Sequence, residues 1–97
     1  LPFSIEEISS NIQEIKLYPN PVIDYVNLEF EVASELKETE IKLLNITGQV
    51  VKNVYSGSLN VGKNTFLIED LNNLSSGKYI ISISSENGIL TKNLVVN

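Results

Sequence analysis

The stretch Leu17-Tyr18-Pro19-Asn20-Pro21 determines how the rest of the chain is organised. Each of its two prolines fixes its own φ at about −65° and lacks a backbone N–H. Each also drives the residue before it, Tyr18 or Asn20, out of the helical region. The stretch is therefore extended and stiff, and it cannot continue as a central strand. We interpret residues 18–21 as the entrance to a single β-domain, and we expect Tyr18 to anchor that entrance to the core.

The residues before this stretch form a polar lead-in. Ile5, Ile8 and Ile12 recur at helix-like spacing, but a segment of this length is too short to be a stable helix by itself. The chain begins with Leu1 and contains no Met, so we expect a fragment of a longer protein. We therefore assign residues 1–14 to a linker from an upstream domain and residues 15–97 to the β-domain.

The residues after the proline stretch alternate between strand patterns and turn signals. Apolar and polar residues alternate from 25 to 32, with Val26, Leu28, Phe30 and Val32 on one face and Asn27, Glu29 and Glu31 on the other. A period of two is typical of a strand with one buried and one solvated face. Comparable patterns predict further strands over residues 14–18, 39–46, 50–55, 65–69, 78–85 and 89–96.

Turn signals separate these strands. Gly48 suits a positive φ in the turn after residue 46, and Asn87-Gly88 is a strong hairpin signal. Residues 33–38 and 56–64 are expected to be connections, the second with room for a short strand around Leu59. About seven strands, with turns about every 8–12 residues, predict an all-β fold. The fold that fits best is a small antiparallel immunoglobulin-like β-sandwich of about seven strands.

The composition excludes several classes of function. Ninety-seven residues are enough for one domain with one core. The net charge is −5, with seven Lys and neither Arg nor His, so the chain has no basic stripe for nucleic acid, and an anionic membrane surface would repel it. The absence of Cys excludes disulfides, thiolate catalysis and Cys-ligated zinc. No apolar run is long enough to span a membrane.

Three features bear a weak likeness to functional motifs. Residues 57–64 approach the phosphate-binding loop pattern, but Asn64 replaces the Ser or Thr that holds magnesium, and a strand pattern follows. Residues 70–73 lack the second acid and the closing Glu of a calcium loop. The clusters Glu29/Glu31 and Glu35/Glu38/Glu40 should be plain solvated charges. We therefore predict no catalytic residue, no cofactor and no metal, and we expect that the chain is not an enzyme.

The remaining motifs follow one another in an order of their own. They are Leu17-Tyr18-Pro19-Asn20-Pro21, then residues 25–28, residues 44–51 around Gly48, residues 74–81 and residues 87–96. In this order they resemble the type A C-terminal sorting domain of the type IX (Por) secretion system, from residue 15 to residue 97. Gly77 and Tyr79 match the family's Gly-x-Tyr block, and Gly88 with Lys92 match its terminal Gly…Lys block. Leu74-Ser75 and the final Asn97 depart slightly from the family pattern.

This resemblance implies a non-catalytic secretion signal. Such a domain directs an exported precursor through the periplasm of a Gram-negative bacterium to the type IX outer-membrane translocon, with an outer-membrane shuttle protein as a partner. A sortase-like surface peptidase often cleaves the domain from its upstream cargo domain. The cargo then remains at the cell surface or is secreted, and the sorting domain itself does not insert into the membrane.

The resemblance also supplies candidate residues. Candidates for recognition by the translocon are Gly77, Tyr79, Gly88, Lys92, Leu94, Val95 and Val96, and Tyr18, Pro19, Asn20, Pro21 and Gly48 are motif residues with a structural role. Two interpretations of the final hairpin stay open. A receptor could add a strand to its free edge, or Tyr79, Gly88 and Lys92 could merely build the hairpin and protect its edge from aggregation. The same edge could also pair with a second copy of the chain.

The main alternative is a carbohydrate- or protein-binding β-sandwich module of a secreted multidomain enzyme. Modules of this kind that bind sugars display exposed aromatic side chains. This chain has no Trp, and among its tyrosines Tyr25 and Tyr55 look free. A purely structural spacer is a third interpretation.

Overall fold

The computed structural model describes residues 11–19, 21–86 and 88–97 of the chain. Its strands are β1 (Ile12–Tyr18), β2 (Val26–Val32), β3 (Leu36–Asn45), β4 (Val50–Leu59), β5 (Gly62–Ile68), β6 (Gly77–Ser85) and β7 (Gly88–Val96), with a short 3₁₀ turn, η1 (Leu71–Asn73), between β5 and β6. Most of the expected linker lies outside the described residues, although β1 already begins within it. No helix in the described part of the chain is long and apolar enough to cross a membrane.

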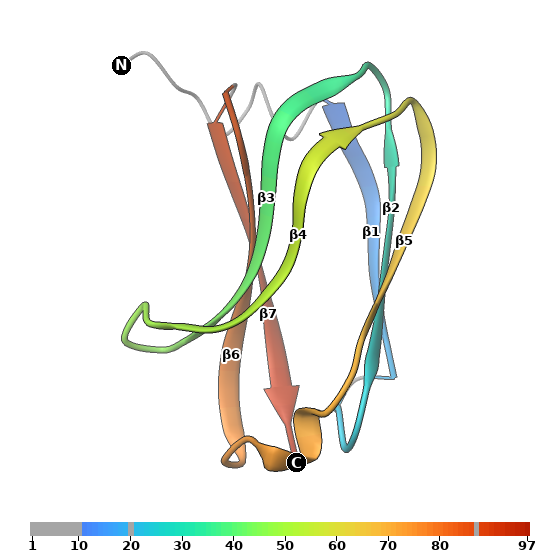
Figure 1. Cartoon of the computed structure of the whole chain (residues 1–97). Coiled ribbons are helices and arrows are strands. Elements are labelled where there is room, and N and C mark those ends of the chain that lie inside the picture. Colours follow the sequence, from blue (N-terminus) through green and yellow to red (C-terminus); the bar gives the residue numbers. More distant parts are fainter. Residues whose placement is uncertain (1–10, 20, 87) are drawn as a thin grey trace.

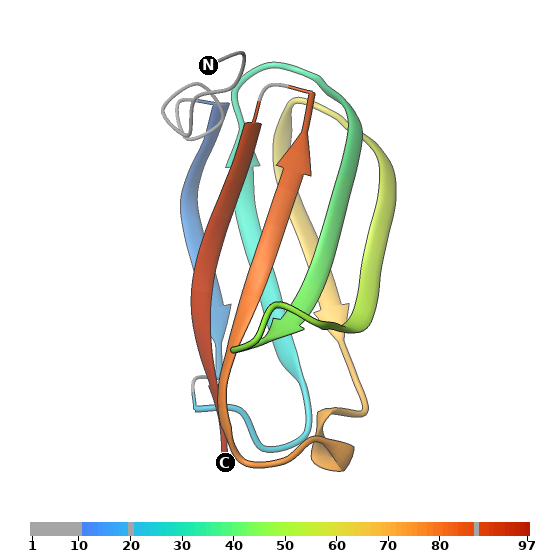
Figure 2. The same ribbon diagram turned by 90° about the vertical axis from the view of Figure 1, so that its left-hand side faces the viewer.

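The strands form two antiparallel sheets packed face to face (Figures 1 and 2). The three-stranded sheet has the order β1-β2-β5, and the four-stranded sheet has the order β4-β3-β6-β7. The pairs β1–β2, β3–β4 and β6–β7 form hairpins within a sheet, whereas the chain crosses from one sheet to the other between β2 and β3, between β4 and β5, and between β5 and β6. The expected small all-β sandwich is confirmed.

The core lies between the sheets and follows the alternation in the sequence. In β2 every second residue from Val26 to Val32 is at most 2% exposed, and in β6 the same holds for Ile81 and Ile83. Phe30 also stacks on Phe66 of β5, with ring centroids 6.0 Å apart. Because one face of each of these strands is buried, a shift of one residue would expose the whole apolar set, so the pattern fixes the register.

The prediction of a loop over residues 56–64 is wrong. Strand β4 continues to Leu59, and β5 starts at Gly62, so that Asn60 and Val61 form the connection. Leu59 is 1% exposed and pairs with Leu36 of β3, and its burial extends the strand across the weak strand formers Ser56-Gly57-Ser58. The phosphate-loop likeness therefore falls on the crossing from β4 to β5, and it is followed by a strand where a phosphate-binding loop needs a helix.

The connection expected over residues 33–38 is also shorter than predicted. Strand β3 starts at Leu36, which is 1% exposed. Between Leu36 and Thr39 the strand holds one residue more than β4 does, and Glu38 there has a φ of 52°. This bulge explains why Leu36 and Thr39 are both buried although they are three residues apart, because an extra residue breaks the period of two.

The anchor of the proline stretch is Val22, and the expectation for Tyr18 is wrong. Tyr18 is 44% exposed, and its hydroxyl donates a hydrogen bond to Oε1 of Glu29 at 3.1 Å. Val22 is fully buried and pairs in parallel with Val96. Tyr18 follows the inward-facing Leu17 in β1, so strand alternation turns its ring to the outer face of the sheet.

Candidate functional site at one end of the sandwich

The motif segments that are far apart in the sequence meet at one end of the sandwich, the lower end in Figure 1. The β1–β2 connection, η1 and the last residues of β7 lie there, and the β3–β4 hairpin projects to the side above them. The register joins them directly, because Asn45 pairs with Tyr79, Gly77 with Val96, and Val22 with Val96. We call this region, residues 17–25, 44–51, 71–80 and 94–97, the motif end.

A short backbone bridge ties the two sheets together at the motif end. The N–H of Val22 donates to the carbonyl of Val95 at 2.8 Å, and the N–H of Asn97 donates to the carbonyl of Val22 at 2.7 Å. Val22 precedes β2 of the three-stranded sheet, and its partners belong to the outer edge of the four-stranded sheet. The side chains of Leu94 and Val96 are at most 1% exposed beneath this bridge. The end of β7 is therefore a structural component of the fold.

Tyr79 closes the connection that leads into β6. Its side chain is 7% exposed, and its hydroxyl donates a hydrogen bond of 2.7 Å to the carbonyl of Ser75. A tyrosine near the start of the sixth strand that bonds back to the backbone a few residues upstream has the geometry of the tyrosine corner of immunoglobulin-like sandwiches. This contact explains why the Gly-x-Tyr spacing suits this position.

Asn45 organises the hairpin between β3 and β4. Its Oδ1 accepts hydrogen bonds from the N–H of Thr47 at 3.1 Å and from the N–H of Gln49 at 2.9 Å. Gly48 has a φ of 89°, a conformation that glycine adopts without steric cost. The hairpin is thus held in one shape while Ile46 near its tip is 71% exposed. A rigid exposed apolar tip is suited to contact with another protein.

The outer face of the four-stranded sheet carries apolar residues at the motif end. Leu44 pairs with Val50 on one side and with Ile80 on the other, and Val95 lies diagonal to Ile80 on β7. Val50 is 47% exposed and Val95 is 38% exposed. We call these four residues, Leu44, Val50, Ile80 and Val95, the outer patch. The sequence offers a signal for it, because Leu44 and Ile80 are apolar at positions whose alternation points to solvent.

The predicted recognition residues differ both in their position along the sandwich and in their exposure. Gly77, Tyr79, Leu94, Val95 and Val96 gather at the motif end, whereas Gly88 lies at the opposite end of β7 and Lys92 lies between. Gly77, Lys92 and Val95 are exposed, while Tyr79, Gly88, Leu94 and Val96 are buried. Of these seven residues, therefore, only Gly77, Lys92 and Val95 are accessible to a receptor that binds the folded domain.

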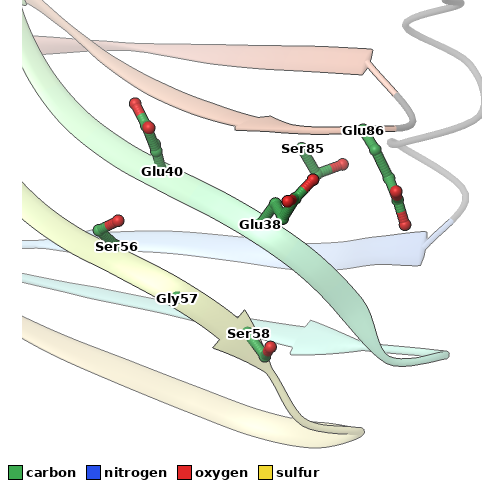
Figure 3. Close-up of a pocket in the computed structure, with 7 residues that line it drawn as sticks. All are labelled: Glu38, Glu40, Ser56, Gly57, Ser58, Ser85 and Glu86. Atoms are coloured by element: carbon green, nitrogen blue, oxygen red, sulfur yellow. The ribbon is translucent and has the colours of Figure 1, made fainter.

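A shallow depression lies at the other end of the four-stranded sheet, on its outer face (Figure 3). It has a volume of about 650 Å³ and is lined by Glu38, Glu40, Ser56, Gly57, Ser58, Ser85 and Glu86. Among the described residues, no group of His, Cys, Asp or Glu is arranged to hold a metal ion. The depression contains none of the predicted recognition residues.

The carboxylates of β2 are less isolated than the sequence predicts. Oε2 of Glu29 forms ion pairs with Nζ of Lys63 at 3.8 Å and with Nζ of Lys16 at 4.0 Å. The pKa of Glu31 is raised from its ordinary value, chiefly because its carboxyl group shares a hydrogen bond with that of Glu14. The two carboxyl groups meet because Gln13 pairs with Glu31 and Glu14 occupies a bulge in β1.

The exposed tyrosines of the described residues are not the pair that the sequence predicts, because Tyr18 is exposed and Tyr55 is not. Tyr55 is not free, because its hydroxyl donates to the carbonyl of Ser58 and its ring packs on Phe66 with centroids 4.9 Å apart. Tyr25 is 45% exposed, as expected.

Comparison with known proteins assigns a family to this arrangement. The model of a family described as "Secretion system C-terminal sorting domain" matches residues 16–97. An ulvan lyase from Nonlabens ulvanivorans is 29% identical over 90 residues, which cover 92% of this chain and 15% of the lyase. The chain therefore spans less than a sixth of the length of that relative.

Proposed function

The chain belongs to the family of secretion system C-terminal sorting domains, and from this premise we propose that it directs an exported precursor to the type IX outer-membrane translocon. The domain acts as an address for cargo that precedes it in the same polypeptide, and it is cleaved off by a sortase-like peptidase at the cell surface. The relative supports the presence of a cargo, because the matched part makes up 15% of an enzyme. The route runs through the periplasm of a Gram-negative cell to the surface or the medium.

The domain needs no catalysis for this role. The chain has no His, Cys or Arg, which removes the commonest general bases, nucleophiles and anion clamps. Its function is therefore one of binding, and the partners are the translocon, its outer-membrane shuttle protein and the peptidase.

The observation that carries the proposal is that most of the family's motif residues, Gly88 and Lys92 excepted, converge on the motif end. The prolines and Val22, the Asn45 hairpin, the Tyr79 corner and the end of β7 come from four separate segments and contact one another there. Their buried members hold the fold, and the exposed outer patch and Ile46 beside them are placed for a receptor. Most of an apolar patch's contribution to binding comes from a few such well-placed residues.

Transport of a fusion protein tests the proposal. The chain is placed behind a signal peptide and a folded fluorescent protein, in one host with the type IX machinery and in one without it. We expect surface or medium fluorescence only in the first host, together with loss of the mass of the domain. Periplasmic retention in both hosts would overturn the proposal.

Substitutions in the outer patch test where the receptor binds. The pair Val50→Ser and Val95→Ser should lower export while the melting temperature stays close to that of the unchanged chain, because both side chains are on the surface. Val61→Ser is the matched control, since Val61 is 65% exposed in the β4–β5 connection, away from the motif end. Equal export of the patch variant and the control would exclude the outer patch.

One observation favours a second candidate, a carbohydrate-binding module. Tyr25 and Leu67 are 45% and 55% exposed and line a depression of about 260 Å³ together with Asp24, Glu69 and Asp70. An aromatic ring beside carboxylates suits a sugar, which stacks on the ring and donates hydroxyl hydrogen bonds. A glycan-binding screen in which Tyr25→Ala abolishes a signal would support this candidate, and a screen without a signal would remove it.

A further inference from the structure

We propose that the outer edge of β7 over residues Ile89–Asn93 accepts an extended peptide segment of the sorting receptor as an added β-strand, and that this segment carries a carboxylate opposite Lys92. The inference rests on the proposed function and names the chemistry of its partner.

The backbone of this part of β7 offers unpaired hydrogen-bonding groups. The carbonyl of Val95 and the N–H of Asn97 point away from β6, because both bond to Val22. By the alternation of a strand, Ile89, Thr91 and Asn93 direct their N–H and carbonyl groups to the same side. Among the described residues, none donates to or accepts from these groups. A row of such groups on a straight edge is a template for another strand.

Val22 shows that this edge already accepts an added segment. It pairs in parallel with the last residues of β7 and covers the edge there. The neighbouring Pro19 and Pro21 have no N–H to donate, so the β1–β2 connection cannot extend the pairing as a regular ladder. The open part of the edge therefore ends where the bridge begins.

The regularity of β7 distinguishes it from two other edge strands. Its nine residues pair with β6 without a register shift. The edge strand β1 has a bulge at Glu14, and β4 has register shifts on either side of Lys52, and such irregularities hinder strand addition. β5 is also regular, but it is shorter, with seven paired residues, and lies on the opposite side of its sheet from β1.

Lys92 selects the kind of strand that can be added. It has the same parity as Leu90, Leu94 and Val96 and pairs with the fully buried Ile81, so it stands on the inner face of an edge strand. It is nevertheless exposed, and it forms no ion pair with another residue that the structure describes. An inward-facing lysine on an edge disfavours undirected pairing, including pairing with a second copy, because a partner strand would desolvate the ammonium. A carboxylate on the incoming strand removes that cost.

Amide hydrogen exchange on the purified chain tests whether the edge is open. We expect the N–H groups of Thr91 and Asn93 to exchange at least about 100-fold faster than those of Leu90 and Lys92, which bond to β6. Comparable protection of all four N–H groups would overturn the proposal, because the edge would then be occupied by the chain itself.

Export of the fusion protein tests whether the receptor uses the edge. Thr91→Pro removes an outward donor and spares the ladder to β6, whereas Thr91→Val changes the side chain and keeps the N–H. We expect Thr91→Pro to be exported at least about tenfold less than Thr91→Val. Val61→Ser is again the control for a surface change outside the edge.

Lysine variants provide an independent arm if the proline destabilises the fold. Lys92→Glu should be exported at least about tenfold less than Lys92→Arg, because it places like charges opposite each other. Equal export of the Glu and Arg variants would overturn the acidic partner, and equal export of folded Thr91→Pro and Thr91→Val would overturn strand addition. Failure of the unchanged chain to be exported in either host would instead refute the proposed sorting function.

Discussion

Removal of a single hydroxyl group at Tyr79 should destabilise the domain measurably. The hydroxyl donates a part-buried hydrogen bond of 2.7 Å to the carbonyl of Ser75, and the Tyr79 side chain is 7% exposed, so Tyr79→Phe leaves that carbonyl without its partner. Loss of the bond together with this unmet acceptor should cost about 1–2 kcal/mol of the free energy of unfolding. For a domain of this length, each 1 kcal/mol lowers the melting temperature by about 4–8 °C.

Urea and thermal unfolding of the chain, followed by circular dichroism, measure this effect. Tyr25→Phe is the matched control, because Tyr25 is 45% exposed and should change stability by less than about 0.5 kcal/mol. The reasoning would be refuted by a Tyr79→Phe variant as stable as the Tyr25→Phe variant. A second outcome would be equally informative: full stability with loss of export would mean that the receptor reads the hydroxyl group directly.

Three further predictions concern other side chains. Thr39 is fully buried and its hydroxyl has no partner among the described residues, so Thr39→Val should raise the free energy of unfolding by about 1 kcal/mol, and a lower urea midpoint would contradict this. Asn45→Ala should cost about 1–2 kcal/mol in the same assay by freeing the β3–β4 hairpin, while the exposed Asn53→Ala should be nearly neutral. The hydrogen bond with Glu14 raises the pKa of Glu31 above its ordinary 4.5, so the folded state binds this proton more tightly than the unfolded state and the wild type loses stability as pH rises through that window. Glu31→Gln should therefore gain stability relative to the wild type between about pH 4 and about pH 7. If the difference between the urea midpoints of the two proteins is the same at about pH 4 and at about pH 7, the shared hydrogen bond is contradicted.

The parts of the fold that the sequence predicts well are those with local causes. The alternation from Val26 to Val32 fixes both the strand and its buried face, because a single face meets the core. Gly48 in its turn likewise follows from the chemistry of its own position. These features need no knowledge of distant residues.

The errors arise where distant contacts decide. Tyr18 has the size expected of an anchor, yet the smaller Val22 is buried, because its partner Val96 lies 74 residues further along the chain. Residues 56–58 look like a loop and form a strand because Leu59 reaches the core beside Leu36. The residues next to Val22 and Leu59 in the sequence give no sign that these two side chains pair with distant strands.

The candidate site shows the same division. The motif residues can be picked out along the chain, but the convergence of most of them at one end, and the burial of Tyr79, Leu94 and Val96, depend on the order of strands in the sheets. The exposed residues beside them, Val50 and Ile46, differ from ordinary surface residues only through this placement.

The bridge at Val22 also has a mechanical consequence. The first residue of β1 and the last residue of β7 lie at opposite ends of the long axis of the sandwich, which extends over 34 Å (Figure 1). A force applied between them runs along the strands, so the ladder between β6 and β7 is loaded in shear, with its bonds sharing the tension. The two bonds of Val22 hold the same strand from its other side. When a single molecule is pulled from these two points, the domain should unfold abruptly at high force. It would therefore stay folded while it transmits a pulling force to a cargo attached before β1.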